Sequence, residues 1–168
     1  MSRSKLIAFI ALITLAFAVT LVADALAGEK AKGRTVGYIT NWQSVKVPDR
    51  EGHIIGFWEG KGVQTVFSGN PFSDGALYNE VGYLDLLDAK TGQRVHHGYY
   101  ELICRDGDKI YSRYEITSVS QGVLYGTWEH LYGTGRYEGI KGKGTFVSHP
   151  SGDRWYSDWE GEVELPKK

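Results

Sequence analysis

The segment from Gly133 to Phe146 restricts the fold of this chain more than any other. It holds five glycines within twelve residues and then runs directly into Thr145 and Phe146. Glycines at this density prevent a stable helix, and they suit tight turns or strands that bend at barrel corners. A phosphate-binding loop would need a helix after its glycines, whereas Lys141 and Lys143 alternate with glycine and lead into a strand-like sequence. We therefore predict a turn followed by a bent strand.

Strand-forming residues and turn signals alternate along most of the chain. All 22 glycines lie after residue 27, and 13% of the residues are aromatic. Eight strand-like segments are expected near residues 34–46, 53–67, 75–87, 96–105, 109–118, 123–131, 142–148 and 155–164. Such a series indicates an all-β sandwich or barrel. We favour an eight-stranded antiparallel up-and-down barrel, because closure removes the exposed sheet edges.

The first 27 residues have the pattern of a secretory signal peptide. Arg3 and Lys5 precede an apolar run over residues 6–23, and Ala25 and Ala27 are small residues at the positions that a signal peptidase reads. We expect a signal-peptide helix over residues 1–27 and a single barrel domain over 28–168, exported to the periplasm or secreted. An uncleaved N-terminal membrane anchor is the alternative, since the run is almost long enough to span a bilayer.

The charged residues, the single cysteine and the histidines argue against a nucleic-acid partner, an internal disulfide and a metal site. The 19 Lys and Arg against 20 Asp and Glu give a net charge of −1, so no basic face for nucleic acid is expected. Cys104 is the sole cysteine, which rules out an internal disulfide. We expect Cys104 to be a small buried apolar residue and not a reactive thiol. His96 and His97 are adjacent and would point to opposite faces of a strand. We therefore expect no metal site and no cofactor.

Two segments predict which side chains face the interior. If Asp106 and Gly107 form a two-residue hairpin loop, the pairs Ile103–Ile110, Glu101–Ser112 and Tyr99–Tyr114 lie on the face that carries the isoleucines. In the last segment Trp155, Trp159, Val163 and Leu165 share one side, and the carboxylates from Asp158 to Glu164 share the other. We assign the isoleucine face and the tryptophan side to the interior.

If the chain forms a barrel, the candidate binding residues are those expected on its inner face, and most of them are aromatic. The inward candidates are Tyr38, Trp42, Trp58, Tyr99, Tyr114, Trp128, His130, Trp155 and Trp159. The alternative is that these rings simply fill the core. Glu101 is the candidate catalytic acid, because a carboxyl group among inward rings would have its pKa raised by desolvation. Alternatively, Glu101 pairs with Arg113 or a tyrosine, or faces solvent after a register shift.

The glycine-rich run also carries a family resemblance. Residues 133–142 (GTGRYEGIKG), together with residues 52–56 (GHIIG) and 60–62 (GKG), resemble motifs of the allene oxide cyclase and dirigent superfamily and its exported bacterial members. The resemblance implies a small eight-stranded barrel with a central cavity, often assembled as a homotrimer. It also implies, from the plant members, cofactor-free cyclisation or coupling of reactive small molecules. The shared motif is structural, so no catalytic residue is transferred from the family.

Three functions are therefore open at the level of the sequence. The first is a barrel that holds a small apolar or aromatic ligand in an aromatic-lined cavity. The second is a cofactor-free cyclase or isomerase, in which an inward acid such as Glu101 assists a confined intermediate. The third is a structural barrel whose interior is filled by its own side chains. We favour the binding barrel.

Overall fold

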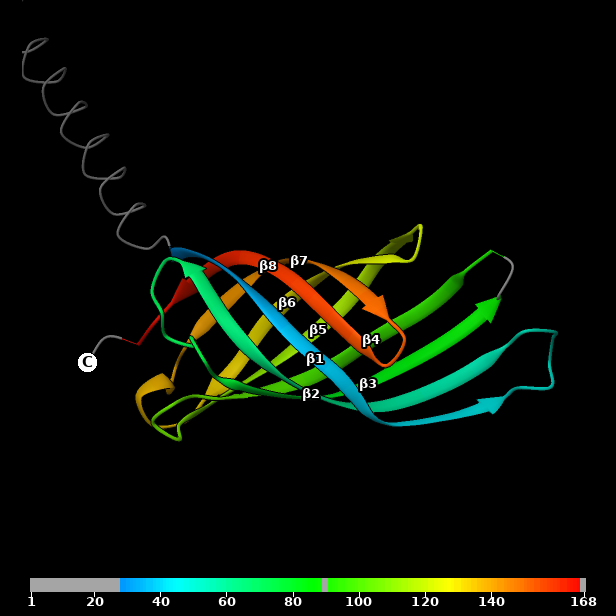
Figure 1. Cartoon of the computed structure of the whole chain (residues 1–168), viewed down its shortest axis with the longest axis horizontal. Helices are drawn as coiled ribbons and strands as arrows, with labels where there is room; N and C mark the ends of the chain where they lie inside the picture. The colour runs from blue at the N-terminus through cyan, green and yellow to red at the C-terminus, as the bar shows by residue number, and fades with distance from the viewer. Residues whose placement is uncertain (1–27, 89–90, 167–168) are drawn as a thin grey trace, which may run out of the picture.

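The chain forms a closed β-barrel in a computed structural model that describes residues 28–88 and 91–166 (Figure 1). The strands are β1 (Glu29–Lys46), β2 (Ile54–Ser68), β3 (Leu77–Asp88), β4 (Gln93–Ile103), β5 (Lys109–Ser120), β6 (Val123–Gly133), β7 (Lys141–Ser151) and β8 (Arg154–Glu164). Each strand pairs antiparallel with the next, and β8 closes the barrel against β1. The predicted eight-stranded antiparallel up-and-down barrel is confirmed, whereas the predicted signal-peptide helix lies outside the described residues.

Period-two alternation explains why these segments are strands with one inner face. In β1, Ala31 and Thr35 are buried, whereas Lys32 and Val36, which follow them directly in the sequence, are exposed. In β8 the predicted alternation is confirmed, since Trp159 and Val163 are buried and Glu160 is exposed.

Among the described residues, no helix is long and apolar enough to cross a membrane.

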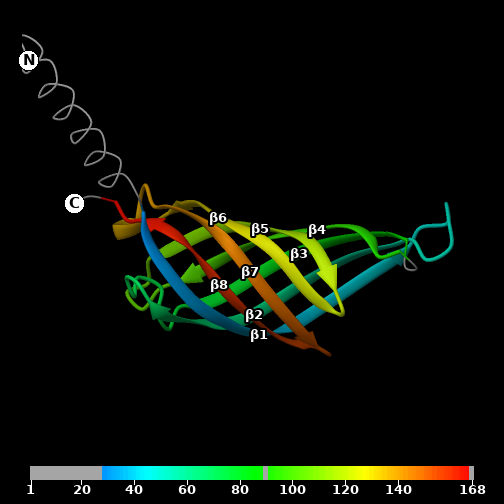
Figure 2. The same cartoon turned by 90° about the horizontal axis from the view of Figure 1, so that it is seen from above.

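The two ends of the barrel differ. The hairpins β1–β2, β3–β4, β5–β6 and β7–β8 lie at one end, which we call the open end, and β1 to β4 extend beyond β7 and β8 there (Figures 1 and 2). The connections β2–β3, β4–β5 and β6–β7 lie at the opposite, closed end. Phe72 and Ala76 of the β2–β3 connection are buried, and the Tyr137 hydroxyl donates a hydrogen bond to the Phe72 carbonyl at 2.7 Å. These connections pack over the barrel and close this end.

The glycine-rich segment belongs to the closed end. It forms the last residue of β6, the 3-10 helix η1 (Gly135–Tyr137), a turn and the start of β7. Gly135 and Gly139 adopt φ values of 52° and 86°, which glycine tolerates at least cost. The predicted turn and following strand are therefore confirmed.

The predicted register of the β4–β5 hairpin is wrong by one residue. The loop has three residues, not two, because the Cys104 amide donates to the Asp108 carbonyl at 2.9 Å across the hairpin. Leu102, not Ile103, therefore faces Ile110. The shift turns the side chains of β4 over, so that Tyr99 and Glu101 point outward and Tyr100 points inward. Tyr99 is 54% exposed.

A bulge in β1 corrects a second prediction. The sequence predicts both Tyr38 and Trp42 inside, and residues four apart do share one face of a regular strand. The pairing with β2 shifts between Ile39 and Asn41, which leaves Thr40 as an extra residue. Tyr38 therefore points outward and is 50% exposed, whereas Trp42 lies at the open end of the interior.

Glycines on neighbouring strands make room for the inward rings. The pairs are Trp159 over Gly33, Trp155 over Gly37, Trp42 over Gly56, Trp58 over Gly82, Tyr114 over Gly98, Phe146 over Gly126 and Trp128 over Gly144 and Gly161. A Cβ atom on Gly82 would lie 2.0 Å from the Trp58 ring, closer than any real contact. The rings therefore lie over the backbone of the wall instead of projecting straight across the barrel.

This packing predicts that alanine at Gly82 destabilises the barrel. The Trp58 ring is buried and packed against Trp42 and His96, and moving it would break these contacts. We therefore expect Gly82→Ala to lower the free energy of unfolding by about 1–3 kcal/mol. Gly56→Ala is the matched control, because its Cβ would meet the Trp42 ring at 2.7 Å, and that ring is 50% exposed and able to swing away. Urea unfolding measures both. A Gly56→Ala variant as destabilised as Gly82→Ala would contradict this account.

Candidate functional site

The barrel interior contains a cavity of about 560 Å³ that opens at the open end. Its wall is predominantly apolar and aromatic. The rings that line it are Trp42, Trp58, Phe72, Tyr78, Tyr100, Tyr114, Trp128, Phe146, Trp155 and Trp159, with the imidazoles of His96 and His130. A volume of this size lies within the range of pockets that bury a drug-sized ligand.

Most of the predicted binding residues meet in this cavity. Trp42, Trp58, Tyr114, Trp128, His130, Trp155 and Trp159 all line it. Tyr38 and Tyr99 do not, because the bulge and the longer hairpin loop place them on the outer surface. The structure thus places seven of the nine candidate residues on the cavity wall, and the other two lie outside it for separate geometric reasons.

Glu101, the predicted catalytic acid, lies outside the cavity. Its carboxylate accepts hydrogen bonds from Asn79 Nδ2 and Lys109 Nζ, both at 3.0 Å. Partial burial alone would raise the pKa of Glu101, but the hydrogen bonds from Lys109 and Asn79 leave it below its usual value. The residue forms a surface ion pair and cannot reach a molecule inside the barrel.

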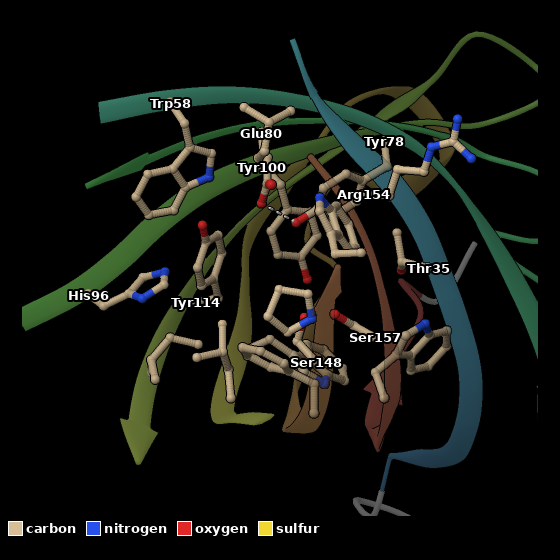
Figure 3. A pocket seen from close by; sticks show the side chains of 18 of the residues that line it. Thr35, Trp58, Tyr78, Glu80, His96, Tyr100, Tyr114, Ser148, Arg154 and Ser157 are labelled. Atoms are coloured by element: carbon tan, nitrogen blue, oxygen red, sulfur yellow. Dashed lines mark hydrogen bonds between the residues drawn. The ribbon is translucent and has the colours of Figure 1, made fainter. Parts of the chain in front are cut away.

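Glu80 is the acid that faces the cavity. It is inward on β3 and lies across from Gly60 of β2, whose missing side chain leaves room for the carboxyl group. The Tyr78 hydroxyl donates a hydrogen bond to Glu80 Oε2 at 3.0 Å. Figure 3 shows the carboxyl group directed into the cavity, with Tyr114 and Trp58 on one side and Tyr78 on the other.

Glu80 is not among the site residues predicted from the sequence. The sequence of the neighbouring strand β2 does indicate that Glu80 faces inward. An inward Trp58 places Gly60 inward as well, and antiparallel pairing then puts Glu80 beside Gly60 on the same inner face.

Burial controls the ionisation of this cluster. Desolvation raises the pKa of Glu80, while hydrogen bonding with Tyr78, Tyr114 and Trp58 acts in the opposite direction. Burial also raises the pKa values of Tyr78 and Tyr114 well above the usual value, and the nearby Glu80 charge adds to this effect. Both phenols therefore remain neutral hydrogen-bond donors at all ordinary pH values.

The two inward histidines are held neutral. Burial lowers the pKa of His130 to about 4, and its Nδ1 lies 2.8 Å from the Ser112 hydroxyl. Burial likewise lowers the pKa of His96 to about 4, with smaller contributions from Arg94 and His97. Neither imidazole is positively charged near neutral pH, so the cavity wall offers no cationic histidine to a ligand.

Several buried nitrogens have no hydrogen-bond partner within residues 28–88 and 91–166. They are His96 Nδ1, Trp128 Nε1, His130 Nε2, Trp155 Nε1 and Trp159 Nε1. The indole edges that carry these nitrogens pack against glycine backbone, as at Gly33 and Gly37. These nitrogens belong to residues that line the cavity. In the same residues no group of three or more His, Cys, Asp or Glu side chains is placed to hold a metal ion.

The neutral histidines predict a loss of stability in acid. In the unfolded chain a histidine takes up a proton near pH 6.5, whereas His130 in the folded barrel does so only near pH 4. The stabilising contribution is therefore present above pH 6.5 and is lost as the pH falls toward 4. We expect His130→Gln to reduce the loss of unfolding free energy between pH 7 and 4.5 by roughly 2 kcal/mol.

His97→Gln is the matched control, because the His97 ring is exposed on the outer face of β4. Urea unfolding at pH 7 and 4.5 measures the difference. The account fails if His97→Gln changes the pH dependence as much as His130→Gln does.

No protein-family model and no curated protein sequence matches the chain. Among solved structures, the barrel is similar to pyocyanin demethylase, with a TM-score of 0.46 and 12% sequence identity over 79% of this chain and 99% of that chain. A likeness of this degree carries no information about ligand or reaction.

Proposed function

We propose that this protein is an exported β-barrel that holds one small apolar or aromatic molecule in its interior. The observation that carries the proposal is the cavity of about 560 Å³ with its aromatic wall. A barrel filled by its own side chains would leave no such space, so the cavity argues against the purely structural barrel. The packing of the rings against glycines is what keeps the centre of the barrel open.

A few polar groups are placed to orient such a molecule. Glu80 and Tyr100 lie on one side of the cavity, and Ser148 and Ser157 lie across from them (Figure 3). Aromatic walls with a small number of polar groups are typical of sites that bind small organic molecules. The ligand that fits best is a flat, largely apolar compound with one or two hydrogen-bonding atoms.

Two parts of the proposal rest on the sequence. Export depends on the signal-peptide pattern of residues 1–27, which lie outside the described residues. Membership of the allene oxide cyclase and dirigent superfamily, with the homotrimer that it implies, is likewise an inference from residues 133–142 and the two shorter motifs.

A second function, a cofactor-free isomerase or cyclase, is favoured by one observation. The cavity contains a buried carboxyl group, Glu80, among phenols and an indole. A desolvated acid beside a confined organic molecule is the arrangement that general acid–base catalysis requires. In this alternative Glu80 takes the role that Glu101 was predicted to have.

The binding function predicts that a bulky side chain inside the barrel blocks ligand uptake. We use N-phenyl-1-naphthylamine as the probe, because it is apolar and aromatic and its fluorescence rises on leaving water. Ser148 is buried and lines the cavity, so Ser148→Phe should weaken binding of the probe at least tenfold by occupying its space. Fluorescence titration of the purified protein measures the dissociation constant.

Ser118→Phe is the control, because Ser118 is exposed on β5 and does not line the cavity. Circular dichroism confirms that both variants are folded. The proposal is wrong if the wild-type protein shows no saturable binding, or if Ser148→Phe binds the probe as tightly as Ser118→Phe.

A further inference from the structure

We propose that Glu80 transfers protons to and from carbon in a small apolar carbonyl compound that occupies the cavity. The inference rests on the proposed function, because the compound must first bind inside the barrel. It goes further by naming the class of substrate and the type of step in which Glu80 acts.

The geometry of Glu80 is that of a positioned base. Its carboxyl group lies against Gly60, is held at Oε2 by the Tyr78 hydroxyl, and faces the cavity. The indole of Trp58 and the phenol of Tyr114 complete its surroundings. No lysine or arginine pairs with it within the described residues, in contrast to Glu101, which is paired with Lys109. A desolvated carboxylate without a cationic partner is a stronger base than one in water.

The position of Glu80 along the barrel keeps it away from bulk water. It lies near the start of β3, toward the closed end, whereas Leu84 lies further along the same strand toward the open end. The closed end is covered by the β2–β3 connection, with Phe72 at the floor of the cavity. A molecule that enters from the open end therefore displaces water before it reaches the carboxylate.

The surroundings of Glu80 also define the class of substrate. The wall is predominantly apolar and aromatic, so the body of the molecule must be largely apolar and able to lie against the rings. Tyr100 is stacked on Tyr78 with ring centroids 4.9 Å apart, and it lines the cavity beside Glu80. Burial raises the pKa of Tyr100, which keeps its hydroxyl protonated and able to donate to a carbonyl oxygen. A carbonyl compound with acidic C–H bonds next to the carbonyl satisfies both groups.

The step balances without any further reactant. The Glu80 carboxylate takes a proton from the carbon next to the carbonyl group, and the C–H electron pair forms a carbon–carbon double bond. The carbonyl π electrons move to the oxygen, where the Tyr100 hydroxyl stabilises the enolate. Return of the same proton to a conjugated carbon gives isomerisation. When the proton on Glu80 is first replaced by a deuteron from D2O that reaches the carboxyl group from the open end, its transfer to the original carbon gives exchange.

The experiment measures hydrogen–deuterium exchange in 2-tetralone, an apolar bicyclic ketone with acidic C–H bonds. The ketone is incubated with the full-length protein in D2O at neutral pD, and loss of the proton signals next to the carbonyl is followed by NMR. We expect exchange roughly 100-fold faster than in buffer alone, the magnitude typical of a positioned general base. Glu80→Gln should return the rate to that of buffer.

Two further variants separate the role of Glu80 from general damage. Glu101→Gln changes a carboxylate of the outer surface and should leave the exchange rate unchanged. Tyr78→Phe removes the hydrogen bond that favours the charged form of Glu80, so the pH midpoint of the exchange rate should move upward. A merely structural role for Tyr78 would lower the rate without moving that midpoint.

The outcomes for the two proposals are distinguishable. No acceleration by the wild-type protein, or equal acceleration by Glu80→Gln, overturns the role of Glu80, and the binding function stands if N-phenyl-1-naphthylamine still binds. If neither the ketone nor the naphthylamine binds, both proposals fail. Acceleration that is lost in Glu80→Gln and retained in Glu101→Gln supports both.

Discussion

The contact between inward aromatic rings and glycines of the neighbouring strands is the constraint on which this structure depends. Trp58 over Gly82 and Tyr114 over Gly98 are directly paired across their strands, and a Cβ atom on either glycine would collide with the ring. Because each ring lies along the wall, it covers backbone that would otherwise face the interior. An eight-stranded barrel is just wide enough for its own side chains to fill it. Here the inward-facing glycines contribute no side chains to the interior, and a cavity of about 560 Å³ remains.

The same constraint explains how the protein combines a stable wall with a hollow centre. At the closed end, Leu102, Ile110 and Tyr137 are fully buried and form an ordinary dense core. The cavity begins beyond this core, and aromatic rings line it together with Leu84, Ile116 and Leu124 toward the open end. The indoles of Trp155 and Trp159 pack on Gly37 and Gly33, and their nitrogens have no hydrogen-bond partner among the described residues. Glu80 fits the same pattern, since its carboxyl group also lies over a glycine.

Sequence reasoning succeeded where one face of a strand was clear from local alternation. The order of the eight strands, the inner side of β8 and the glycine-rich turn before β7 all follow from periodicity and turn residues. It failed at Glu101 and Tyr38, each time because one additional residue reversed a face. The third loop residue at the β4–β5 hairpin and the bulge at Thr40 are decided by backbone hydrogen bonds across strands, which short sequence patterns do not encode. Glu80 was recognisable only through the pairing of β2 with β3.

The central claim is that the ring-lined interior is an accessible apolar cavity, and a crystal structure of the protein under xenon pressure tests it most directly. Xenon enters empty apolar cavities and leaves strong density there. The account predicts xenon inside the barrel, between Trp128 and Tyr114, with both rings against their glycines. A barrel whose rings turn inward and fill the centre, with xenon only on the outer surface, would contradict it.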